Sequence, residues 1–131
     1  MKSTLLGLAL LIVCAPSAQA QDRPTVKDCA GVYGALAQEQ GAFGSTDSLM
    51  GERYTNFAKI DFNDRLAQLA RKEEMGISEL QTSSETQRSS DYMKLVDAET
   101  EGTMDSPDVL ALTRLSDTCD AEYGFTPSLG G

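Results

Sequence analysis

The chain has 131 residues, with 20 acidic and 11 basic side chains, so its formal net charge is −9 at pH 7. This excess of acid repels phosphate backbones and anionic lipid surfaces, so neither nucleic-acid binding nor membrane binding is expected. The chain has no histidine, which removes the commonest catalytic base and metal ligand.

The first twenty residues have the pattern of a secretory signal peptide. Lys2 precedes an apolar run from Leu5 to Ala15, and the segment ends in the small-x-small pattern of residues 18–20. The run has about 11 residues, whereas a membrane-spanning helix needs about 20. We therefore expect cleavage after Ala20, and a periplasmic or secreted mature protein of residues 21–131.

Cleavage would also change the charge and the cysteine count. It removes one of the 11 basic residues and none of the 20 acids, so the mature charge becomes −10. It removes Cys14 and leaves Cys29 and Cys119, which an oxidising compartment would join as one disulfide. Lipidation of Cys14 is an alternative, but bulky residues stand before it where acylation requires small ones.

The first predicted helix spans residues 26–40, with Thr25 as its N-cap. Its larger apolar residues share a stripe about 100° wide, and this stripe places Cys29 towards the core. Gly31 and Gly34 lie on the other side. If that side is exposed, they would let the backbone of a partner come close.

The second predicted segment, residues 47–74, has two apolar faces that are rotated by about 120° from each other. We expect a kink or a split near residues 59–64, where Asp61 or Asn63 can cap a second piece. The third segment, residues 79–101, begins with a capping box of Ser78 and Gln81. Its first half has one large apolar residue, so residues 79–91 are expected to be exposed and mobile, and whether they are helical stays open.

The fourth predicted helix begins after Ser106, with Pro107 at its first position, and ends before Gly124. Cys119 falls on its apolar side, and residues 124–131 form an irregular tail. The sequence thus predicts an all-α fold, a small four-helix up-and-down bundle. In such a bundle the start of the first helix and the end of the last lie at the same level, which suits a Cys29–Cys119 bridge.

No motif for catalysis or for a cofactor is present, so the sequence predicts a non-enzymatic protein without a cofactor. The best metal candidate is the acidic stretch of Asp97, Glu99, Glu101 and Asp105, which continues to Asp108, but it lacks the calcium-loop spacing. We interpret it as a charged loop and expect no metal. Together with Gly31 and Gly34, these four acids are the candidate interaction surface.

The leading functional hypothesis is an exported protein that acts through contacts with a protein partner. One alternative is an inhibitor or immunity protein against a basic secreted enzyme, since opposite charges speed association. A second alternative is a small-ligand or calcium-binding module. Without histidine, any pH response must come from carboxylates below about pH 5, so stability is expected to be flat between pH 6 and 8.

Overall fold

The computed structural model describes residues 23–103 and 105–130, so the expected signal peptide and its cleavage site lie outside the described residues. The described residues form helices and no strand, which confirms the predicted all-α class. The elements are α2 (Val26–Phe43), α3 (Leu49–Arg53), the 3₁₀ turn η1 (Phe57–Lys59), α4 (Phe62–Lys72), α5 (Ile77–Ser83), α6 (Glu85–Glu101) and α7 (Pro107–Tyr123). None of these helices is long and apolar enough to cross a bilayer.

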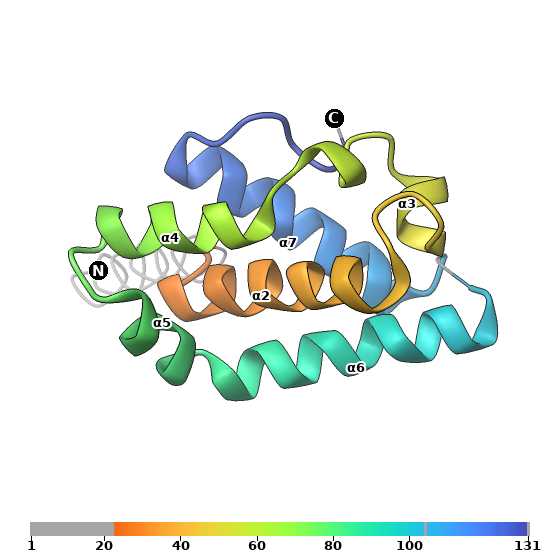
Figure 1. The fold of residues 1–131 in the computed structure, drawn as a ribbon, viewed down its shortest axis with the longest axis horizontal. Helices are drawn as coiled ribbons and strands as arrows, with labels where there is room; N and C mark the ends of the chain where they lie inside the picture. Colours follow the sequence, from red (N-terminus) through yellow and green to blue (C-terminus); the bar gives the residue numbers. More distant parts are fainter. Residues whose placement is uncertain (1–22, 104, 131) are drawn as a thin grey trace, which may run out of the picture.

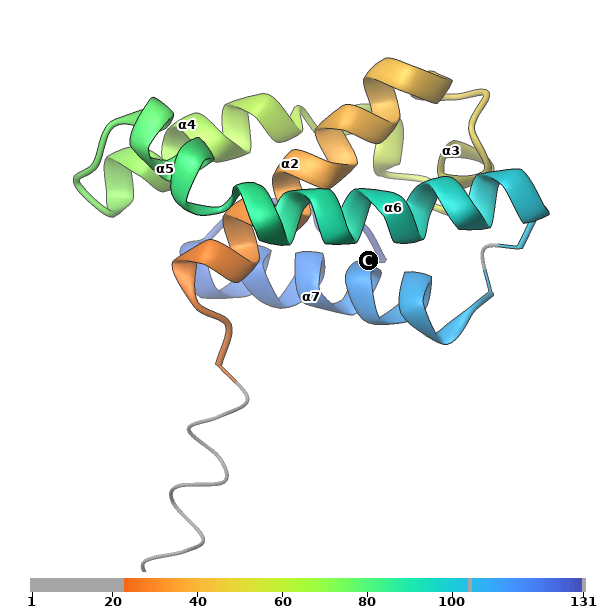
Figure 2. The same cartoon turned by 90° about the horizontal axis from the view of Figure 1, so that it is seen from below.

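The four longer helices alternate in direction along the chain, as an up-and-down bundle requires (Figure 1). Helix α2 lies at the centre. It packs against α6, α4, α7 and α5, and α4 and α6 flank it on opposite sides (Figure 1). The view from below shows α7 running beside α6 on the remaining side (Figure 2). The fold is therefore a central helix surrounded by its neighbours.

The burial of α2 follows from its composition. Every residue from Cys29 to Leu36 is buried, because small or apolar residues occur on all sides of this part of the helix. Gly31 and Gly34 lie on the side of α2 opposite the stripe of larger apolar residues, as predicted. That side is not exposed, because α6 covers it. A Cβ atom on Gly31 would lie 2.4 Å from Gln87 Cγ, so glycine is what allows α6 to approach this closely.

The predicted second segment is split, as its two apolar faces indicated. The backbone is extended at Tyr54 and at Ile60, which separates α3, η1 and α4. The Asp61 side chain accepts a hydrogen bond of 3.0 Å from the backbone N–H of Asp64, which confirms Asp61 as the N-cap of α4.

Two predicted boundaries are wrong, and the structure answers one question that the sequence left open. Helix α2 continues through Gly41 to Phe43. The Ser78 capping box does not form, because α5 begins earlier, after Gly76, which makes no side-chain cap. Residues 79–91 are helical, with a single break at Ser84, and Asp91 is buried among otherwise mostly exposed neighbours.

The tail after α7 is irregular, as predicted, but it packs against the bundle. Phe125 and Leu129 are buried. The Arg65 side chain donates a hydrogen bond of 2.7 Å to the Pro127 carbonyl, and the backbone N–H of Leu129 donates one of 2.7 Å to Asp117. The tail therefore packs against the core and is held there by hydrogen bonds.

Candidate functional site

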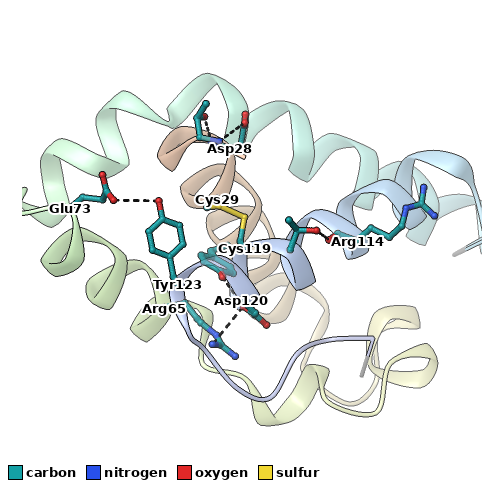
Figure 3. The surroundings of a disulfide bond; sticks show 11 residues. Asp28, Cys29, Arg65, Glu73, Arg114, Cys119, Asp120 and Tyr123 are labelled. Carbon is teal, nitrogen blue, oxygen red and sulfur yellow. Dashed lines mark hydrogen bonds and ion pairs between the residues drawn. A yellow bond between two sulfur atoms is a disulfide. The ribbon is translucent and has the colours of Figure 1, made fainter. Parts of the chain in front are cut away.

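The disulfide joins the first and last described helices, as predicted (Figure 3). The Cα atoms of Cys29 and Cys119 are 5.7 Å apart, within the range that a bridge requires. Both residues are completely buried. A buried disulfide without access to solvent is a structural cross-link and not a reactive thiol pair.

A buried polar cluster lies beside this disulfide and links three helices. Asp120 on α7 accepts a hydrogen bond of 2.6 Å from the Tyr33 hydroxyl on α2. Arg65 on α4 reaches the same carboxyl oxygen at 3.6 Å (Figure 3). Burial raises the pKa of Asp120, although the Tyr33 hydrogen bond and the Arg65 charge both act to lower it. Because all three residues are buried, the cluster holds α2, α4 and α7 in position.

A cleft lies on the side of α2 between α4 and the α5–α6 segment. Its volume is about 620 Å³. The buried residues of its lining are Ala30, Gly34, Leu66 and the polar Ser84, and half-buried Ala37 extends this floor. Such a floor lets a peptide backbone come close to α2.

The exposed lining residues form a polar rim around this floor. Gln38, Asn63 and Gln81 contribute side-chain amides. Arg88 donates hydrogen bonds to Gln38 and, at 2.6 Å, to Glu85, and this contact lowers the pKa of Glu85. Amides and an arginine–carboxylate pair can bond to the backbone groups of a peptide. The cleft therefore has the chemistry of a binding site, with an apolar floor and polar edges.

The four acids of the predicted surface do not act together. Asp97 and Glu101 are exposed, and Asp105 pairs with Arg53 at 2.5 Å. Glu99 is half-buried and accepts hydrogen bonds from the backbone of α3. Among the described residues, no three acidic or cysteine side chains are arranged to hold a metal ion.

The predicted interaction surface is therefore not one continuous face. Gly31 and Gly34 are buried beneath α6 of the same chain, and so the side they occupy is covered. Gly34 alone keeps a part in a candidate site, because it lines the cleft beneath the Arg88 side chain. Most of the cleft residues were not singled out by the sequence, since they come from three segments whose packing the sequence does not reveal.

Sequence reasoning also missed Glu39. This residue of α2 has no exposed surface, and neither of its carboxyl oxygens has a hydrogen-bond partner of normal geometry in the described structure. Burial, and after it the negative charge of Glu99, raises the pKa of Glu39 to about 8. Glu39 follows Cys29, Val32 and Leu36 at helical spacing on the same stripe. This spacing was the signal that could have predicted its burial.

No protein-family model, curated protein or solved structure matches this chain.

Proposed function

We propose that this protein is an exported, disulfide-linked helical protein that binds an extended segment of a protein partner in the cleft along α2. The observation that carries the proposal is the lining of that cleft. Its floor includes Ala30 and Ala37, whose small side chains leave room for a backbone, and its rim carries side-chain amides that can bond to peptide groups.

The charge of the chain favours a basic partner. The excess of acidic over basic residues, 20 against 11 in the full sequence, attracts positively charged proteins and raises their rate of association, especially at low salt. Asp64 and Glu79 are exposed on α4 and α5, the elements beside the cleft. The segment held in the cleft is thus expected to carry lysine or arginine next to small apolar residues.

Two observations support export. The apolar run before Ala20 has the pattern that signal peptidase recognises. The cross-link between Cys29 and Cys119 is of a kind that persists in oxidising compartments and is rare in the cytosol. An inhibitor of a basic secreted enzyme would be one protein of this type, and it is favoured by the same charge complementarity.

A matched pair of substitutions on one helix tests the proposal. Once a partner has been isolated from the exported fraction, its affinity is measured for Ala37→Arg, which fills the cleft, and for Ala42→Arg. Ala42 is exposed on the same helix and does not line the cleft. Both variants change the charge equally. We expect Ala37→Arg to weaken binding at least about tenfold and Ala42→Arg less than about twofold. Equal losses would show that the partner binds elsewhere.

A further inference from the structure

The tail after α7, residues 125–130, is held in the way that an extended peptide is held in a groove. It runs back along α7 towards η1 (Figure 1). Two of its carbonyl groups accept hydrogen bonds from side chains of other elements. Asn56, which precedes η1, donates to the Ser128 carbonyl at 2.8 Å, and Arg65 of α4 donates to the Pro127 carbonyl at 2.7 Å. The tail therefore depends on the groove for its conformation.

Asp117 of α7 and two apolar anchors complete this groove. The Asp117 carboxyl group accepts hydrogen bonds from the backbone N–H groups of Leu129 and Gly130 at 2.7 and 3.1 Å. A Cβ atom on Gly130 would lie 2.6 Å from Asp117 Oδ2, so the fit is close at this position. Phe125 and Leu129 are buried, and the Arg65 guanidinium lies 4.8 Å from the centre of the Phe125 ring. Both the backbone and the side chains of the tail thus match the groove.

A single glycine joins the tail to α7. Gly124 is the C-cap of α7, and its φ of 73° lies in the left-handed region. The N–H of Phe125 donates a hydrogen bond of 2.8 Å to the Asp120 carbonyl, which turns the chain back onto its own helix. Gly124 and the start of the tail also line a pocket of about 400 Å³ beside α4, so there is space around this turn. If Gly124 were helical instead, α7 would continue and carry the tail away from its own groove.

We propose that the groove formed by Asn56, Arg65 and Asp117 also binds the tail of a second copy of this chain, and that two copies exchange tails through a change at Gly124. A second copy carries the same tail, so the contacts of the closed form can be remade between two chains. Tethering favours the closed monomer, because an attached tail has an effective concentration on the order of millimolar. We therefore expect a monomer at micromolar concentration and a dimer that appears towards millimolar concentration. The proposal does not rest on the use of the cleft.

Two glycines with the same backbone conformation provide a matched test. Gly124 and Gly102, the C-cap of α6, both have a φ of 73° and open space around the Cβ position. Alanine is strained by a similar amount at each, but only at Gly124 does exchange of the tail relieve the strain. In the mature, oxidised protein, we expect Gly124→Ala to raise the dimer association constant at least about tenfold and Gly102→Ala less than about twofold. Analytical ultracentrifugation from micromolar to millimolar concentration measures both constants.

The dimer itself shows whether the tail forms the interface. The Leu129 amide should stay protected from hydrogen exchange in the dimer, because it is then bound to Asp117 of the second copy. Adding Asp117→Ala to Gly124→Ala should abolish the dimer. Gly124→Asn covers the case in which Gly124→Ala does not fold, since asparagine tolerates the left-handed region better and should give a smaller increase. A folded Gly124→Ala that stays monomeric at millimolar concentration, an equal rise in Gly102→Ala, or a dimer that survives Asp117→Ala would overturn the proposal.

Discussion

The Tyr33 hydroxyl donates a hydrogen bond of 2.6 Å to Asp120, and this bond joins α2 to α7 one residue beyond the disulfide. Both groups are buried, and burial together with this hydrogen bond raises the pKa of Tyr33. The covalent and the polar link therefore act at the same place. Together they fix the position of α7 along the axis of α2.

Replacing Tyr33 by phenylalanine tests the polar link. The Tyr33→Phe variant keeps the ring and leaves Asp120 without its closest donor, so the free energy of unfolding should fall by about 1–3 kcal/mol. Urea unfolding measures this change. Tyr123→Phe is the control, because the Tyr123 hydroxyl makes only a 3.4 Å contact with Glu73 near the surface. Similar effects of the two substitutions would contradict a special role for the Tyr33 bond.

Two glycines of the same helix should respond to alanine in opposite ways. In Gly31→Ala the new Cβ would lie within 3.2 Å of the Arg88 backbone nitrogen as well as close to Gln87, so α6 must move. We expect a loss of about 1–3 kcal/mol from overpacking. Gly41 has open space around its Cβ position, and Gly41→Ala should stabilise the helix by about 0.5–1 kcal/mol. Thermal melts compare the two, and stabilisation by Gly31→Ala would refute the close approach of α6.

Removing the disulfide should cost more than any of these changes. The bridge spans a sequence separation of 90 residues. The chain-entropy model gives about 4–5 kcal/mol for a loop of this length, which is comparable to the stability of a small domain. Unfolding of the double variant Cys29→Ser, Cys119→Ser measures the loss. Reductant should destabilise the wild type and leave the variant unchanged; a variant as stable as the oxidised protein would show that the cross-link is dispensable.

Stability should fall as the pH rises from about 4.5 to about 8. An unfolded glutamate loses its proton near 4.5, whereas Glu39 keeps its proton in the folded state up to about pH 8. The folded state therefore binds more protons over this range, and each such group can contribute a slope of up to about 1.4 kcal/mol per pH unit. Burial raises the pKa of Asp91 and Asp120 as well, which adds to the same trend. Urea unfolding at several pH values measures the slope, and a flat profile would contradict it.

This trend replaces the flat stability that the sequence predicted between pH 6 and 8. The absence of histidine suggested that nothing titrates in that range, because the argument used the ordinary pKa values of exposed carboxyl groups. Glu39 departs from its ordinary value because it is buried beside Glu99. That proximity depends on how α2 and α6 pack, and single-residue values do not contain this information.

Local signals in the sequence predicted the local features of the fold. The cap at Asp61, the helix that starts after Ser106 and the inward position of the two cysteines all depend on neighbouring residues, and the structure confirms them. The burial of Gly31 and Gly34 could not be predicted from the sequence, because the amphipathic pattern assumes that a helix has one exposed face. A helix with small residues on every side can be covered on every side.

The cleft was not predicted because its lining is assembled from distant segments. Ala37, Leu66 and Gln81 have no relationship in sequence, and they meet only because α4 and α5 pack against α2 and against each other. Neither the charge nor the composition of any one segment reveals such an arrangement.

Site-specific crosslinking tests the proposed binding cleft most directly. A photoreactive amino acid is placed at Ala37 in one version of the protein and at Ala42 in another, and each version is exported and irradiated in the cell that produces it. We predict that position 37 forms a covalent adduct with one basic protein through a lysine- or arginine-containing segment, and that position 42 does not. Adducts from position 42 alone, or none from position 37, would contradict the account.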